Sequence, residues 1–565
     1  MFKFVDQIRL SKIKPLIVLI VFALPTHWIF FEPKLRLDDW SQIIHPHVYE
    51  YMKWFDWNQG RPLIWTIYKG IIALTGLRIH VFYIINFLIV IGIAFLIYKI
   101  LDQLLPDLHP IPLIAALFAM LYPADYTLTW ITMINIRLAW LLTLIGMWAL
   151  LEYATKGGAG HLIIGYFGLL LPLLNYEGTV GIIVLWCLFI IAINGKNSFK
   201  NNVFLLVPIM LTVFFIIYKI YLIPKIGIAD IYINNPDTVS PIQFLDRFRN
   251  ISVLFWAWVI PLQNLIQRFV QYFPNRWLTS TIIIFVIFAY MLIVRVILNS
   301  IKIHERPSYN KFEKKQYFRN FSGVLLVSAG FVLLGYIPII SAFKPNLDDV
   351  STRVNMYAIP AAAVVIVVII SITALIFSKD KKQWQILLLA GTFPLIVLGM
   401  AINITVNHFG QESWVKQKEI WHQLFDLAPR IKENTTVVFV MNGYYRLEHG
   451  AHPPLYAEWE TDTALQVLYE DESLEGRIYF PGIDIYSEAT FTPDGVEDAF
   501  KTKMASYEEV ILLKYQPGTE VLKLIYDPEE EMGLTFEVAN YAPSNRIIPD
   551  TGKIWNYRYL VQDDT

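Results

Sequence analysis

Apolar residues gather in long runs along the chain, separated by shorter polar stretches. A helix needs about 20 consecutive apolar residues to cross a bilayer core, so runs approaching that length predict membrane spans. The runs that we expect to cross are 15–32, 79–101, 110–123, 128–154, 161–175, 177–194, 203–223, 277–299, 321–343, 354–378 and 384–406. The pattern therefore predicts a mainly α, polytopic transmembrane bundle of about eleven spans.

Two further runs are apolar but interrupted by polar side chains. Residues 61–77 contain Arg61 and Lys69, and residues 251–272 are interrupted by Gln263, Gln267 and Arg268. Such mixed segments are typical of helices that lie at the membrane surface. We expect residues 40–77, which also carry four tryptophans, to form surface helices in the first outer loop.

Composition agrees with a membrane protein and excludes an ordinary soluble enzyme. Hydrophobic residues make up 56% of the 565 residues and charged residues only 16%. The net charge of −1 offers no basic footprint for a nucleic-acid partner. Cys187 is the single cysteine, so intramolecular disulfides are excluded. A basic flank precedes the first apolar run. We interpret this run as a retained signal anchor.

Basic residues predict which side of the membrane each loop occupies. With these spans, the N-terminal flank and three later loops fall on one side, which the positive-inside rule assigns to the cytoplasm. The later loops carry Lys196, Lys200, Lys302, Arg306, Lys311, Lys314, Lys315, Arg319, Lys379, Lys381 and Lys382. An odd number of spans then places the C-terminus outside.

The composition changes near residue 407. Polar residues become more frequent, a helical stretch covers 413–430, and β-like runs appear at 435–441 and 510–514. We therefore expect a transmembrane catalytic domain over 1–406 and a small extracytoplasmic α/β or α+β domain over 407–565.

Unusual polar residues concentrate on the predicted outer face. They include the pair Asp38 and Asp39 just after the first run, His45 and His47, the loop around Asp125, the turn 175–178, and the segment 344–353. A pump or proton relay would distribute ionisable groups through the membrane depth instead. This placement indicates chemistry or binding at the outer surface.

The layout resembles the GT-C superfamily of integral-membrane glycosyltransferases, which use sugars carried on polyprenyl phosphate. The resemblance rests on the span number, the Asp-Asp pair opening the first outer loop, Arg61 at its end, the turn 175–178 and Arg353 at the start of a late span. It covers most of residues 1–406, and its motifs are short. It implies transfer at the outer face from a polyprenyl-phosphate-linked donor to a glycan, lipid or protein acceptor.

The resemblance gives the catalytic role to an aspartate of the first outer loop, here Asp38 or Asp39. A carboxylate can take the proton of the attacking acceptor hydroxyl, and a second carboxylate can raise its neighbour's pKa or help to hold a divalent cation. The candidate metal ligands are Asp38, Asp39, His45 and His47. In the structural alternative, the aspartates are solvated and Asp39 caps the following helix.

The candidate substrate-binding residues are Arg353, Arg61, Glu177 and Tyr176. The guanidinium fork suits a lipid phosphate, and Glu177 lies between two apolar runs without a local basic partner. The alternatives are an interfacial Arg353 paired with Asp348 or Asp349, and a solvated turn at Glu177.

Two other functions remain open at this stage. One is a transporter or flippase for lipid-linked oligosaccharides, and the other is a polysaccharide polymerase or ligase. Arg137 is the main ionisable residue inside a run, and we expect it to pair with Asp125 or Glu177 as a structural contact.

Overall fold

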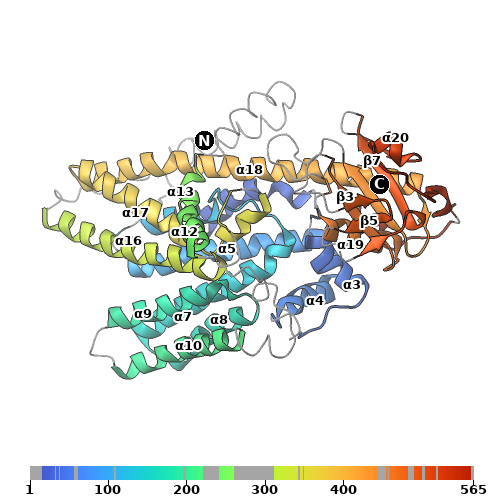
Figure 1. Ribbon diagram of the computed structural model, residues 1–565. Coiled ribbons are helices and arrows are strands. Elements are labelled where there is room, and N and C mark those ends of the chain that lie inside the picture. Colours follow the sequence, from blue (N-terminus) through green and yellow to red (C-terminus); the bar gives the residue numbers. More distant parts are fainter. Residues whose placement is uncertain are drawn as a thin grey trace, which may run out of the picture. The chain divides into compact units, whose positions relative to one another are not determined.

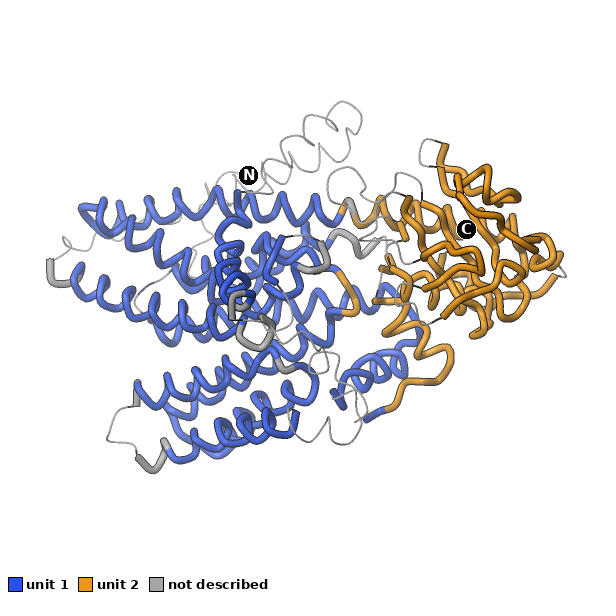
Figure 2. The backbone as a smooth tube through the Cα atoms, viewed as in Figure 1, with its two compact units in different colours: residues 1–31, 54–129, 133–407 blue, residues 32–53, 130–132, 408–565 orange. Residues whose placement is uncertain are grey.

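The chain forms two compact units. The first comprises residues 1–31, 54–129 and 133–407, and the second comprises 32–53, 130–132 and 408–565 (Figure 2). The computed structural model describes residues 15–31, 34–36, 38–55, 61–106, 108, 110–194, 199–219, 241–259, 311–340, 344–347, 349–441, 454–455, 457–481, 489–498, 503–516, 519–550 and 552–561. Residues 32–53, which we grouped with the membrane region, thus belong to the same unit as the C-terminal segment.

The first unit is built from helices (Figure 1). Its α-helices are α2 (Pro15–Ala23), α4 (Ile64–Thr75), α5 (Ile79–Leu104), α6 (Ile111–Met120), α7 (Ile134–Lys156), α8 (Ala159–Leu170), α9 (Val180–Asn194), α10 (Phe199–Ile217), α12 (Pro241–Arg249), α13 (Val253–Trp256), α16 (Lys311–Ile340), α17 (Ile359–Phe377) and the first part of α18 (Lys381–Leu427). Short 3₁₀ turns join several of them: η2 (Leu24–Phe31), η5 (Ile131–Met133), η6 (Leu171–Leu174), η7 (Glu177–Thr179), η10 (Asn250–Ser252) and η11 (Asp349–Asn355).

Five helices among the described residues are long and apolar enough to cross a membrane. They are Ile79–Leu104, Ile131–Lys156, Lys314–Tyr336, Ile359–Phe377 and Lys381–Leu427. Each coincides with a run predicted to span, so the chain is a multi-pass membrane protein. The count of eleven stays a prediction, because 277–299 lies outside the described residues and the other apolar helices are shorter.

The first predicted span is not one continuous α-helix. Helix α2 ends at Ala23 and gives way to η2, within which His27 has non-helical backbone angles. Pro25 stands at this transition, and proline removes an amide donor from the helical ladder. Helix α4 has only twelve residues, about 18 Å at the α-helical rise. It is therefore too short to cross, as expected for 61–77, while its placement at the membrane surface stays a prediction.

The second unit has a small α/β fold, as the sequence predicts. Its main sheet has the order β3-β2-β7-β8, from β2 (Thr436–Met441), β3 (Glu475–Tyr479), β7 (Val510–Gln516) and β8 (Val521–Leu524). Strand β2 pairs in parallel with β3 and β7, and β8 is antiparallel to β7. All six residues of β2 are buried, which explains its uninterrupted apolar run.

Smaller elements complete this unit. A three-stranded antiparallel sheet contains β4 (Ala489–Thr492), β5 (Gly495–Asp498) and β6 (Met504–Ala505), and β1 (Arg430–Ile431) pairs with β9 (Ile547–Ile548). The helices are α19 (Glu458–Tyr469), α20 (Pro528–Met532) and the end of α18, which covers most of the predicted 413–430 helix.

Residues 32–53 join the second unit by packing on α19. Their elements are the π-helical turn η3 (Trp40–Ile44) and α3 (His45–Val48), and both contact α19. The hydroxyl of Tyr49 donates to the carbonyl oxygen of Gln466 at 2.8 Å, and that of Tyr51 donates to Glu472 at 2.8 Å. The segment that carries the aspartate pair is therefore anchored to the C-terminal domain, through residues more than 400 positions away.

Candidate functional site

Asp38 and Asp39 lie at the start of the helical segment that continues into η3. The amide of Asp39 donates to the carbonyl oxygen of Arg36 at 2.7 Å, and the Asp39 carboxylate accepts the Arg36 amide at 2.9 Å. Asp39 has helical backbone angles and makes no N-cap hydrogen bond. The expectation that it caps the helix is therefore wrong: it reaches back over the first turn, as the N3 residue of a capping box does.

The Asp39 carboxylate is almost completely buried, with 1% of its surface exposed. One oxygen accepts the Arg36 amide, and the other accepts both the amide of Thr132, at 3.0 Å, and its hydroxyl. Burial raises the pKa of Asp39 to about 7, the nearby Asp38 adds to the increase, and the hydrogen bonds oppose it. Asp39 is thus held on both oxygens by its own unit and is not solvated.

Asp38 is the more approachable member of the pair, with 8% of its surface exposed. Its Oδ1 accepts a hydrogen bond from Nε1 of Trp459, at 3.2 Å. Trp459 belongs to α19, and 46% of its surface is exposed. The indole therefore connects Asp38 to the surface of the second unit, and the Asp38 side chain is less completely enclosed than that of Asp39.

Two basic residues precede the pair, and our sequence analysis did not select either. Lys34 and Arg36 are buried, with 1% and 8% exposed. Burial lowers the pKa of Lys34 well below its usual value, the Arg36 charge lowers it further, and Asp39 opposes both. The signal that could have identified them is the alternation Lys-Leu-Arg-Leu-Asp-Asp, which concentrates four charges directly after an apolar run.

Arg36 lies directly against Gly410 in the second unit. A Cβ built on Gly410 would overlap the guanidinium group of Arg36. Only glycine leaves room for this approach, so Gly410 fixes where the guanidinium can lie.

The two histidines belong to α3. The His45 ring packs against Tyr49, with ring centroids 4.8 Å apart, and burial lowers its pKa. Within the described part of the chain, no group of three or more His, Cys, Asp or Glu side chains could hold a metal ion. The divalent cation stays a prediction.

In the first unit, three segments that the sequence analysis selected come together. The Arg61 guanidinium lies 4.4 Å from the ring centre of Tyr176. Tyr176 stacks on Tyr357, with centroids 5.6 Å apart and planes at 20°. Tyr357 ends the segment 351–357, so it joins the Arg61 and 175–178 motifs to the one that contains Arg353. The side chain of Glu177, which begins η7, lies outside the described part.

Arg353 is half-buried in η11. Hydrogen bonds of its neighbours hold this turn: the Thr352 hydroxyl accepts the Tyr126 amide at 3.0 Å, and Asn355 accepts the Tyr336 hydroxyl at 2.7 Å. The proposed alternative partners of Arg353 cannot be assigned, because Asp348 and the Asp349 side chain lie outside the described part. Arg353 belongs to the first unit and the aspartate pair to the second, and the role of Arg353 in substrate binding stays a prediction.

Arg137 is a structural residue, and its partner is Asp125. The guanidinium donates to Asp125 at 3.2 Å and to Asn86 at 2.9 Å, and both it and Asp125 are buried. Asp125 also accepts the amide and hydroxyl of Thr127. Charges buried in this way are stable only when paired and hydrogen-bonded, which this network achieves.

No family model and no curated protein matches the chain. Among solved structures, it is similar to the crystal structure of ArnT from Cupriavidus metallidurans in the apo state, at 12% identity and a TM-score of 0.35, over 77% of this chain and 84% of that one. It is also similar to the same protein bound to undecaprenyl phosphate, at 13% identity and a TM-score of 0.33, over 80% and 87%. At this level of similarity, neither structure assigns an activity or a residue role to this chain.

Proposed function

We propose that the protein is a membrane glycosyltransferase of the GT-C type. It moves a sugar from a polyprenyl-phosphate-linked donor to a glycan, lipid or protein acceptor at the extracytoplasmic face. The observation that carries this proposal is the buried cluster of Lys34, Arg36, Asp38 and Asp39, in which four ionisable side chains lie within six residues.

This cluster contains the groups that the transfer needs. The carbon–oxygen bond between the sugar and the phosphate breaks, and its electron pair leaves with the polyprenyl phosphate. The acceptor oxygen forms the new bond to the sugar carbon, and its proton passes to Asp38. Fixed positive charge, here from Arg36, stabilises the negative charge of the leaving phosphate. Arg353 and Arg61 are proposed as further contacts to the donor.

The two aspartates have different parts in this mechanism. Asp38 accepts a hydrogen bond from an exposed tryptophan, whereas both oxygens of Asp39 are held by backbone and threonine donors. We therefore assign Asp38 as the base and Asp39 as the positioning residue that fixes the turn. No step of this mechanism needs a divalent cation.

The alternative of a transporter or flippase has less support. That function would use ionisable groups that change partners within the membrane. Arg137, the main candidate, is instead committed to Asp125, Asn86 and Thr127.

The test is transfer by the Asp38→Asn variant of the full chain, assayed with polyprenyl-phosphate-linked sugars by the release of polyprenyl phosphate. Asparagine keeps the shape but cannot take the proton, so we expect a rate loss of about 10²–10⁴. Asp246→Asn is the control, because this exposed carboxylate pairs with Lys344 and has no part in the mechanism. Full activity in both the Asp38→Asn and Asp39→Asn variants would remove the basis of the proposal.

A further inference from the structure

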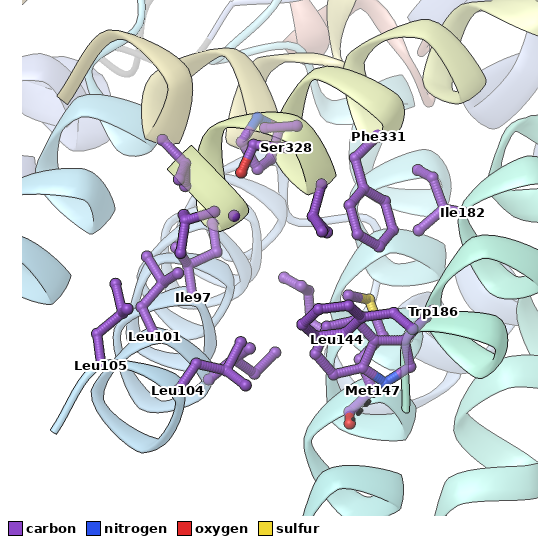
Figure 3. A pocket seen from close by; sticks show the side chains of 18 of the residues that line it. Ile97, Leu101, Leu104, Leu105, Leu144, Met147, Ile182, Trp186, Ser328 and Phe331 are labelled. Atoms are coloured by element: carbon purple, nitrogen blue, oxygen red, sulfur yellow. Dashed lines mark hydrogen bonds between the residues drawn. The ribbon is translucent and has the colours of Figure 1, made fainter. Parts of the chain in front are cut away.

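A large apolar cavity lies among the helices of the first unit. Its volume is about 490 Å³, and side chains from α5, α7, α9, α16 and α17 line it. Figure 3 shows Leu101 of α5, Leu144 of α7, Trp186 of α9 and Phe331 of α16 converging on this space. The cavity is within the range of small-molecule and lipid sites, about 300–1,000 Å³.

The lining determines what the cavity can hold. A buried water needs two to four polar partners, and most of this lining consists of aliphatic and aromatic side chains. The lining residues of α16 run from Arg319 to Phe331, which spans about 18 Å at the α-helical rise. An apolar space of this length fits a hydrocarbon chain and not a group of waters.

Gly323 keeps the cavity open. It stands inside α16 and lines the cavity. Apart from its chain neighbours and the backbone of its own helical turns, no atom of the described residues lies within 4 Å of the position that a Cβ would occupy. A glycine inside a helix costs about 0.5–1 kcal/mol relative to alanine. Because no helix packs closely enough there to require glycine, the open volume itself is what the residue provides.

One end of the cavity is polar and basic. Arg319 and Asn320 line that end, and both are exposed. Lys314 and Lys315 precede them on the same helix, in a loop region that the positive-inside rule assigns to the cytoplasmic side. An arginine fork at the end of an apolar groove has the chemistry that binds a phosphate headgroup.

We infer that this cavity binds one anionic phospholipid, with an acyl chain along α16 and the phosphate at Arg319. The charge at the Arg319 end favours this occupant over the polyprenyl chain of a glycosyl donor, whose phosphate we place on the opposite side of the membrane. The choice between these two occupants rests on the proposed function, and Tyr357, which stacks on Tyr176, also lines the cavity. The test measures lipid binding alone, so the two proposals can fail separately.

The experiment uses the full chain in phosphatidylcholine nanodiscs titrated with phosphatidylglycerol, with bound lipid counted by native mass spectrometry. We expect the wild type to retain one phosphatidylglycerol. Arg319→Gln should weaken its binding about fivefold or more, because one cation near a lipid surface contributes about that much. Gly323→Leu should abolish retention by filling the cavity, and Val327→Phe, at a second lining position, should repeat this result.

Two matched controls separate the site from general effects. Lys382→Gln removes an exposed cation from α18, and Ser322→Leu adds an aliphatic side chain in the same turn as Gly323 but outside the lining. Both should bind like the wild type. Retained lipid in folded Gly323→Leu and Val327→Phe, or equal effects of Arg319→Gln and Lys382→Gln, would overturn the inference. Displacement of phosphatidylglycerol by equimolar polyprenyl phosphate would also overturn it.

Discussion

The buried carboxylate of Asp39 should give the protein a pH-dependent stability that a single substitution removes. Its pKa of about 7 lies roughly 3 units above its usual value of 3.8, which corresponds to about 4 kcal/mol. The folded state therefore binds a proton on the Asp39 carboxylate more tightly than the unfolded state does. The contribution to stability is therefore complete below about pH 4 and is lost as the pH rises through 7.

The Asp39→Asn variant has no proton to lose at this position. The interval from pH 5 to the folded-state pKa of about 7 is about 2 pH units, and each unit corresponds to about 1.4 kcal/mol. Raising the pH from 5 to 8.5 should therefore lower the free energy of unfolding of the wild type by about 3 kcal/mol relative to that of the variant. The asparagine oxygen can still accept from Thr132, but its amide group faces the Arg36 amide, another donor. This mismatch lowers the free energy of unfolding of the variant by about 1–3 kcal/mol at every pH. It therefore does not change how the stability difference between the two proteins depends on pH.

The assay is thermal unfolding of the full chain in nanodiscs from pH 5 to pH 8.5. The difference in Tm between the wild type and Asp39→Asn should change by about 6–12 °C over this range, at the usual 2–4 °C per kcal/mol for a domain of this size. Asp246→Asn, which changes an exposed carboxylate, should follow the wild type. Parallel profiles for the wild type and Asp39→Asn would refute the reasoning, because they would mean that burial does not raise the pKa of Asp39.

Three further predictions concern other parts of the chain. Gly410→Ala should displace the Arg36 guanidinium and reduce the rate of transfer without unfolding the first unit. A wild-type rate of transfer would contradict the close approach of Arg36 to Gly410. Arg137→Met should destabilise the protein by about 3–5 kcal/mol, because it leaves the buried Asp125 without its cation, and adding Asp125→Asn should restore part of the loss in denaturant unfolding. A C-terminal reporter should be active only outside the cytoplasm, and cysteine labelling of residues 310–318 from outside would reverse the predicted orientation.

The membrane helices could be predicted because a bilayer imposes a requirement that is local in sequence. A run such as 354–378 must be apolar throughout, and the structure has α17 at Ile359–Phe377. The buried strand β2 was predictable for the same reason, since a strand covered on both faces is also a continuous apolar run.

The environment of the aspartates could not be predicted, because distant residues create it. The threonine that holds Asp39 is 93 positions away, and the tryptophan that donates to Asp38 is 421 positions away. Without them, two carboxylates after a span are expected to be solvated. Lys34 and Arg36 were missed on the same grounds, since charges beside an apolar run usually lie at the interface. The Arg61–Tyr176 contact likewise depends on tertiary packing.

The second unit is built from segments that lie far apart in the sequence, which has a consequence for the biosynthesis of the protein. This unit combines residues 32–53 with residues 408–565, so the ribosome must synthesise the whole intervening chain before the unit can close. At about 5–20 residues per second, the 354 residues between positions 53 and 408 take roughly 20–70 s. During that interval, the segment with both aspartates has been synthesised but lacks α19, on which it packs. A nascent chain that has not reached α19 therefore has no assembled aspartate site, and assembly of the site must follow synthesis of that helix.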